Sequence, residues 1–385
     1  MPEPQTEESP SGPRAHPGLV PETGPAPSLM RGYLPAIIVA TLLLLCVLWG
    51  TVYGSLCERR DKELEAEARQ NLNIARLLAE QTAQLVQTVN QATLRARDEV
   101  LASPGQSPQL VRYANETGLS PRILVQLALA DADGQMLASN LDPTGSRLKG
   151  ISISDREHFL VHAQRDQNAR EALLNPDALF ISRPVLGKVS KRWTIQLSRR
   201  ITDAEGRFWG VIVASVDPGY FEALFRTVDL GRNGTLTLIG RDRVVRARVR
   251  EGRPVDVGAT MSPGMPFERM ELGVEGSFIS TSSLDQTERQ VAFREVAGTR
   301  LAVLVATATS TALESWQSSR NTAVALGLAT TVALLFGAAG AALALRRLDE
   351  AHRQLLENEI AAAAQRARTQ HASDYGSTRP TLHGD

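Results

Sequence analysis

The chain has 385 residues, enough for two or three domains of ordinary size. Its 42 Lys and Arg residues balance its 42 Asp and Glu residues, and this neutrality argues against a nucleic-acid-binding protein, which would carry a basic surplus. Two cysteines cannot make a disulfide framework or a four-ligand zinc site. With 43% apolar residues, the chain as a whole is not disordered.

The first segment, residues 1–31, is rich in proline and poor in large apolar side chains. Such a composition cannot bury enough surface to offset the entropy lost on ordering. The sequence therefore predicts a disordered tail here.

Two long apolar segments, residues 32–57 and 321–345, contain no charged side chain. Each exceeds the roughly 20 apolar residues that a membrane-spanning helix needs. Tyr33, Trp49 and Tyr53 lie near the ends of the first segment, as in an aromatic belt. The second is rich in Ala and Gly, which favours close packing on another helix. Transmembrane helices are therefore predicted at 32–57 and 320–345.

The orientation of these helices follows from the basic residues beside them. Arg346, Arg347 and Arg353 follow the second span, and this favours a cytoplasmic C-terminus. The first span conflicts, since basic residues at 59–62 lie on its far side, but long domains translocate largely regardless of flanking charge. Residues 58–320 are expected in the periplasm and both termini in the cytoplasm, at the inner membrane.

A stalk helix is predicted for residues 58–103, because no Gly or Pro occurs between Ser55 and Ser103. Apolar residues recur there at helical spacing, which indicates one apolar face. The residues of this face are Leu64, Ala68, Ala75, Leu78, Leu85, Val89 and Ala92.

Beyond Pro121 the apolar period changes to two and turn signals appear, which is typical of strands. Strands and hairpins are expected around 123–140, 191–217, 235–249 and 276–309, with a helix capped by Ser154 or Asp155 and another begun by Pro218. The fold class is therefore α+β, with antiparallel sheets and helices on one side. Two modules are predicted, at 104–230 and 231–319.

An internal repeat supports the two modules. Residues 206–215 (GRFWGVIVAS) and 298–307 (GTRLAVLVAT) match at an offset of 92, which aligns Val211 with Val303 and Val213 with Val305. An offset repeat of this kind indicates related modules in tandem.

The C-terminal segment 346–385 is predicted to be helical to about Gln370 and disordered after Ser373. Leu348, Ala351 and Leu355 fit a coiled-coil stripe, and a solvated helix is the alternative. The tail holds no cyclase or kinase motif, so no enzyme activity is expected from this chain.

The whole pattern resembles a known family. A long helix leaving the membrane, two PAS-like modules and a second span resemble the double Cache sensor domain of bacterial receptors, found ahead of diguanylate cyclases and histidine kinases. The stretches that carry the resemblance are DREHF (155–159), RWTIQLSRRITDAEGRFWGVIVASVDPGYF (192–221) and RQVAFREVAGTRLAVLV (289–305).

The resemblance implies a ligand site in the membrane-distal module. Amino-acid-binding members carry Arg-x-Trp-Tyr and a later Asp, which hold the ligand carboxylate and ammonium. Arg156 matches the Arg and Asp217 the Asp, while His158 and Phe159 stand in place of Trp and Tyr. A small organic acid is therefore as good a candidate as an amino acid, since guanidinium suits any carboxylate.

Strand residues complete the predicted site, and a purely structural role for two of its residues is the alternative. Arg183 and Trp193 are candidate lining residues, and period two puts Trp193 and Gln196 on opposite faces, so one of them points inward. Arg156 and Asp217 alternatively form a structural ion pair.

His158 and His162 have a spacing that can hold metal, but no carboxylate ligand set accompanies them. The sequence predicts neither a metal nor a cofactor.

The expected function is that of an inner-membrane sensor. It binds a small periplasmic carboxylate or amino acid and signals across the bilayer, as a homodimer or through a cytoplasmic partner. One alternative is the sensor half of a cyclase or histidine kinase whose catalytic domain is encoded separately. Another is a membrane scaffold that binds nothing.

Overall fold

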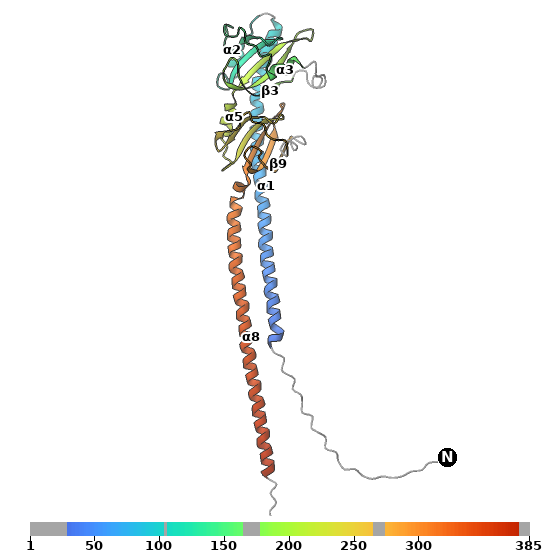
Figure 1. Cartoon of the computed structure of the whole chain (residues 1–385), viewed down its shortest axis with the longest axis vertical. Helices are drawn as coiled ribbons and strands as arrows, with labels where there is room; N and C mark the ends of the chain where they lie inside the picture. Colours follow the sequence, from blue (N-terminus) through green and yellow to red (C-terminus); the bar gives the residue numbers. More distant parts are fainter. Residues whose placement is uncertain (1–28, 104–105, 165–177, 265–273, 377–385) are drawn as a thin grey trace, which may run out of the picture. The chain divides into compact units, whose positions relative to one another are not determined.

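The computed structural model describes residues 29–103, 106–164, 178–264 and 274–376 (Figure 1). Most of the predicted N-terminal tail, residues 1–28, lies outside the described residues, as do residues 377–385. The chain divides into two compact units. One combines residues 1–54 with 322–385, and the other is Ser55–Asn321.

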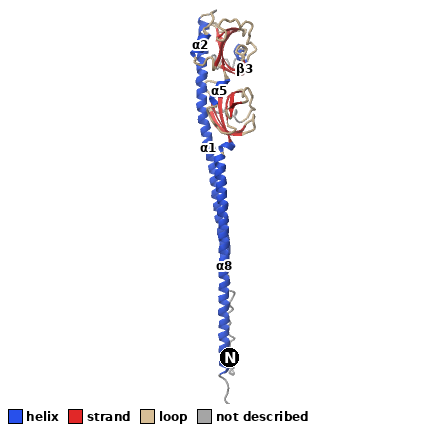
Figure 2. Cartoon of the chain, turned by 90° about the vertical axis from the view of Figure 1, so that its left-hand side faces the viewer, coloured by secondary structure: helices blue, strands red, loops and turns tan. Residues whose placement is uncertain are grey.

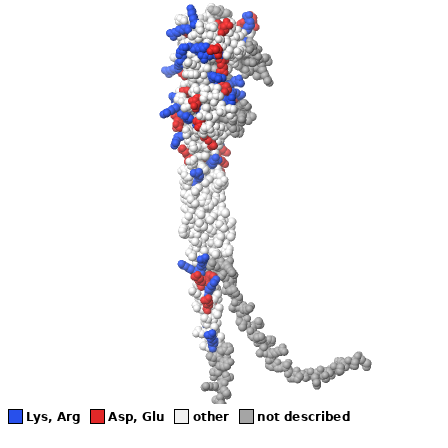
Figure 3. Space-filling view, viewed as in Figure 1, with Lys and Arg blue, Asp and Glu red and all other residues white. Residues whose placement is uncertain are grey.

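The first unit contains the two apolar segments. Helix α1 (Leu29–Ala102) and helix α8 (Glu314–Gly376) are each long and apolar enough to cross a membrane. Figure 3 shows a band on these helices without Lys, Arg, Asp or Glu. Trp49 Nε1 donates to Thr331 Oγ1 at 3.1 Å, and the Trp49 ring lies against Gly327, where a Cβ would meet it at 3.4 Å. The small residues of the second segment thus allow the close approach that the sequence predicted.

The C-terminal helix extends further than expected. α8 continues to Gly376 rather than ending near Gln370, and it includes residues 374–376 of the segment that was predicted to be disordered, while the rest of that segment lies outside the described residues. Its composition explains this difference, because Ala, Gln and Arg dominate and no Pro interrupts it before Pro380.

The membrane-distal module follows α1 in the second unit. Its elements are α2 (Leu110–Glu116), β1 (Leu124–Asp131), β2 (Met136–Ser139), α3 (Glu157–Ala163), β3 (Phe180–Leu186), β4 (Trp193–Thr202), β5 (Phe208–Val216) and α5 (Pro218–Phe225). The strands form an antiparallel sheet in the order β2-β1-β5-β4-β3. Arg183 was expected on a strand, but the bounds of β3 were not predicted, because Pro184 and an irregular register against β4 interrupt its alternation.

The membrane-proximal module repeats this plan. It comprises β6 (Thr235–Gly240), β7 (Val245–Arg250), β8 (Arg253–Pro254), β9 (Glu275–Thr281), β10 (Glu288–Glu295), β11 (Leu301–Ala308) and the short helix α7 (Thr309–Ala312). The antiparallel sheet has the order β8-β7-β6-β11-β10-β9. The predicted α+β class with two antiparallel sheets is confirmed.

The two sheets share one topology, but the predicted repeat register is wrong. Strands β5 and β11 hold the same central place. We call the sheet face toward α1 the inner face. Val303 and Val305 lie on it, in the core that includes α1, whereas Val211 and Val213 lie on the outer face with α3. Because side chains alternate along a strand, the true offset differs from 92 by an odd number of residues.

One apolar face of α1 forms the inner wall of both modules, and Figure 2 shows α1 running alongside both sheets. Of the predicted stripe, all residues except Ala68 are buried. Buried polar contacts add to this packing: Asn71 Nδ2 donates to Gln290 O at 3.1 Å, and Arg199 Nη2 donates to Asn90 Oδ1 at 2.7 Å. A single core thus extends from α1 through both sheets.

A further link between α1 and the proximal module is ionic. Arg76 of α1 forms a two-pronged pair with Glu275 of β9, and Arg294 donates to the same carboxylate at 2.8 Å. Hydrogen bonding from Arg76 and the charges of both arginines lower the pKa of Glu275 from 4.5 to about 2.

We expect this link to make stability depend on acid. A carboxylate with a lowered folded pKa contributes stability above its unfolded pKa of 4.5, and loses it as pH falls toward 2. Between pH 4.5 and 2, the Glu275→Gln variant should therefore lose less free energy of unfolding than the unmodified chain. The difference should be about 1 kcal/mol or less, as for partly exposed pairs. Thermal unfolding across this pH range measures the difference, with exposed Glu80→Gln as the control. Equal acid sensitivity of Glu275→Gln and the unmodified chain would contradict the assignment.

Candidate functional site

A cavity of about 30 Å³ lies on the outer face of the distal sheet, between β1, β4 and β5, the start of α3 and the segment after β3. Its lining combines charged, polar and apolar side chains: Gln126, Ala128, Met136, Ile153, Arg156, His158, Val185, Leu186, Gly187, Lys188, Val189, Gln196, Val213 and Ser215.

The first positively charged group in the cavity lining is Arg156, at the start of α3. Arg156 is the residue before the helix, in an extended conformation, so its side chain leaves the chain before the helical turns begin. Its Nε is buried and has no hydrogen-bond partner within the described residues. The nearest carboxylate, that of Asp155, is 3.9 Å away. A buried donor without an acceptor costs free energy, and an anion in the cavity would remove that cost.

The second cation is Lys188, from the segment after β3. Its Nζ donates to Asp155 Oδ1 at 2.6 Å and to Ser152 O at 2.7 Å, and these bonds fix it at the cavity wall. Lys188 lowers the pKa of Asp155, which therefore stays ionised at neutral pH. Two cations and one carboxylate leave one positive charge at this wall.

His158 is neutral at physiological pH. It is 5% exposed, and burial, followed by the charge of Arg156, lowers its pKa from 6.5 to about 4. Its Nδ1 has no hydrogen-bond partner among the described residues. A neutral imidazole with a free nitrogen can donate to or accept from a ligand, depending on its tautomer.

Amide and hydroxyl groups form the opposite wall. Ser215 Oγ donates to Gln196 Oε1 at 2.6 Å, and Gln196 Nε2 donates to Thr194 Oγ1 at 2.7 Å. Gln126 Nε2 donates to Ser139 Oγ at 3.0 Å. Gln196 is buried, whereas Trp193 is 64% exposed, so Gln196 is the inward residue of the pair left open by the sequence.

The structure places the other candidate residues away from this cavity lining. Phe159 is buried in the core, edge-on to Phe208 at 5.7 Å between ring centroids. Arg183 is paired with Glu157 at 3.2 Å on the surface.

Asp217 takes a structural role in the described arrangement. It caps α5 by accepting from Gly219 N at 2.8 Å, and it also pairs with Arg192. Arg156 and Asp217 therefore have different ionic partners, and the structure does not bring them together as an ion pair.

The two histidines of α3 do not converge. His162 Nε2 is bonded to Ser198 Oγ at 2.9 Å, while His158 faces the cavity. Within the described ranges, no group of three or more His, Cys, Asp or Glu side chains could hold a metal ion.

Sequence reasoning missed Lys188, Gln126 and Ser215. Lys188 follows a strand whose end was not predicted, so nothing in the sequence linked it to Arg156. The two polar residues carried a signal, because Gln126 and Ser215 are polar positions within otherwise apolar strands.

The cavity has room for only one or two water molecules in this conformation. A ligand of several atoms requires one wall to move outward. Residues 185–189 are the most easily displaced wall, since β3 is an edge strand that pairs on one side only.

Comparison with known proteins agrees with this architecture. The Cache domain family matches residues 60–316, and the chain belongs to this family of sensor domains. No curated protein sequence matches the chain.

Solved structures share the fold at low identity. The extracellular domain of rpHK1S-Z16, described as a histidine kinase, has 24% identity and a TM-score of 0.54, covering 66% of this chain and 99% of its own. The periplasmic sensory domain of the Campylobacter jejuni chemoreceptor Tlp1 has 14% identity and a TM-score of 0.48, covering 66% and 98%. The ligand-binding domain of the Pseudomonas aeruginosa amino acid chemoreceptor PctC, in complex with GABA, has 15% and 0.44, covering 62% and 99%. Of these three, the likeness to rpHK1S-Z16, with a TM-score above 0.5, shows a shared fold alone.

Burial of His158 predicts a second acid effect. Because its folded pKa lies below its unfolded value, the folded state loses stability as pH falls from 6.5 toward 4. The loss is at most on the order of 3 kcal/mol. His158→Gln should flatten the change in melting temperature over this range, while His352→Gln, on the exposed face of α8, should leave it unchanged. An unchanged slope in His158→Gln would show that the imidazole is not held neutral.

Proposed function

We propose that this chain is a two-pass membrane sensor that binds a small organic anion in the distal cavity. The observation that carries the proposal is the buried, unpartnered Nε of Arg156 in a cavity whose wall bears one surplus positive charge. The Cache family supports a sensory role for the domain.

The ligand class follows from the groups that line the cavity. A carboxylate would accept from the Nε edge of Arg156 and gain attraction from Lys188, while Gln196 and Ser215 would meet a hydroxyl or carbonyl group. An ammonium group has no free carboxylate among the lining residues, since Asp155 is bound to Lys188 and Asp217 to Arg192. We therefore favour a small carboxylic acid over an amino acid.

The signal would start at the displaced wall. Ligand entry moves residues 185–189, and β3 carries the movement to Ser182, whose carbonyl accepts from Arg246 Nε of the proximal module at 3.2 Å. Arg246 is also bonded to Asp242. A ligand shifts such an equilibrium only by its different affinity for the two arrangements.

The proposed topology places residues 58–320 in the periplasm and both ends in the cytoplasm. The cytoplasmic part of α8 would then act on a partner protein or on a second copy in a parallel dimer. Leu348 and Leu355 are exposed at heptad spacing on this helix, as a dimer seam requires.

Binding is tested by calorimetry on the full chain in lipid nanodiscs, with a panel of small mono- and dicarboxylates. Arg156→Ala should weaken binding at least about tenfold, since a charge-assisted hydrogen bond contributes about 1.5–3 kcal/mol. Arg183→Ala is the matched control, because Arg183 lies on a neighbouring strand outside the lining. Unaltered affinity in Arg156→Ala would refute the site.

Topology is tested by labelling intact cells with a membrane-impermeant maleimide. In a background where Cys46 and Cys57 are alanine, a cysteine at exposed Thr88 should be labelled and one at exposed Glu357 should not. The reverse pattern would place the modules in the cytoplasm and end the sensor proposal in its present form.

A further inference from the structure

A second cavity lies in the proximal module, on the outer face of its sheet. Its volume is about 130 Å³. Its lining combines hydroxyl groups and two arginines with apolar side chains: Thr235, Thr237, Arg248, Met261, Ser262, Pro263, Gly264, Ser280, Thr281, Ser282, Ser283, Arg289, Val291, Leu304 and Ala306. No residue of the distal site contributes to it.

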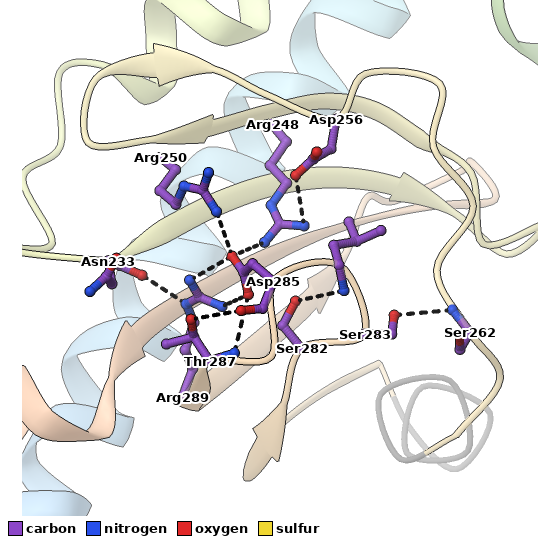
Figure 4. Close-up of polar contacts among 11 residues, drawn as sticks. Asn233, Arg248, Arg250, Asp256, Ser262, Ser282, Ser283, Asp285, Thr287 and Arg289 are labelled. Carbon is purple, nitrogen blue, oxygen red and sulfur yellow. Dashed lines mark hydrogen bonds and ion pairs between the residues drawn. The ribbon is translucent and has the colours of Figure 1, made fainter.

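Arg248 is the unusual group in this lining. It projects from β7, and its side chain is only 2% exposed. Nη2 donates to Asp285 Oδ2 at 3.3 Å, and Nη1 lies 3.5 Å from Asp256 Oδ2. Nε and Nη1 have no hydrogen-bond partner among the described residues, and the contact of Nη1 with Asp256 is an ion pair only (Figure 4). A buried guanidinium with free N–H groups is costly unless an acceptor completes it.

The neighbouring carboxylate, that of Asp285, is already engaged by two other arginines and cannot accept from the free N–H groups of Arg248. Asp285 accepts from Arg289 Nη1 at 2.7 Å and Nη2 at 2.9 Å, and from Arg250 Nη1 at 2.8 Å (Figure 4). Burial would raise the pKa of Asp285, but hydrogen bonds and charge from Arg289 and Arg250 outweigh it and hold the pKa well below its usual range. Asp285 therefore stays ionised and fully engaged.

The charges of the cluster do not balance. Three arginines, Arg248, Arg250 and Arg289, face two aspartates, Asp256 and Asp285. One positive charge is left, and it lies beside a cavity whose only charged lining residues, within the described ranges, are Arg248 and Arg289. A monoanion would neutralise it, whereas a zwitterion would place its ammonium group beside arginines.

The geometry points to a second ligand site in this cavity, for a small monocarboxylate whose carboxylate accepts hydrogen bonds from the free N–H groups of Arg248. Its hydrocarbon chain lies against Met261, Val291, Leu304 and Ala306. A cavity of about 150 Å³ holds benzene, so this one suits a chain of about two to four carbons. Thr235 and Thr237 stand beside the carboxylate position and suit a 2-hydroxy group.

The test uses the full chain in lipid nanodiscs with propionate, butyrate and lactate as probes, followed by calorimetry. The unmodified chain should bind at least one of them. Arg248→Met should lose at least about tenfold in affinity. Arg253→Met, an exposed arginine outside the lining, is the matched control and should bind normally.

A second variant separates loss of the site from loss of folding. Val291→Phe fills the cavity and leaves Arg248 in place, so it should also abolish binding while its melting curve remains cooperative. Arg156→Ala should keep this binding, which distinguishes the proximal site from the distal one.

Three results would overturn the inference: no binding of any probe at millimolar concentration, binding retained when Arg248→Met or Val291→Phe is combined with Arg156→Ala, or binding lost in Arg156→Ala alone. Inorganic phosphate that displaces propionate with equal affinity would also overturn it, because a bare anion site does not need the apolar wall.

Discussion

The structure of the sensory unit depends on the apolar face of α1 between Ala75 and Val100. Both sheets bury their inner faces against it, and α5 adds Phe221 and Phe225 to the same core. Among the elements that the structure describes, neither sheet has another helix of comparable length to cover its inner face. The outer faces are thereby left for the two cavities, so the packing that stabilises the modules also decides where a ligand can enter.

Polar contacts beside this core connect α1 to both modules and the two modules to each other. Asn71 and Asn90 attach α1 to the proximal and distal sheets, and the guanidinium of Arg246 joins the proximal module to β3. Such buried contacts have few alternative arrangements, because breaking one leaves an unpaired polar group. A displacement at the distal cavity is therefore expected to move both modules and α1 together, rather than one loop alone.

The sequence predicted the architecture better than the site. The helical period of α1 and the strand alternation were enough for two α+β modules, because these patterns depend on local periodicity. The repeat offset of 92 was wrong by an odd number of residues. A Val-x-Val pattern occurs on both faces of a sheet, so it does not show which face its side chains occupy.

At the site, Arg156 and His158 were found because they stand at positions of the Arg-x-Trp-Tyr motif that the family resemblance supplied. Lys188 depended on an edge strand hidden by Pro184 and on a contact over 30 residues away in sequence. Arg248 was not singled out, because alternating arginines in β7 resemble an ordinary solvated strand until burial is known.

The role of α1 as a common wall also sets a limit on how this protein can evolve. One residue inserted between Asn71 and Asn90 would rotate the rest of the helix by about 100° and turn its apolar face away from the distal sheet. Seven residues make almost two full turns and preserve the phase. Homologous chains should therefore differ in the length of this segment by multiples of about seven, while the loops that border the outer cavities are free to change one residue at a time.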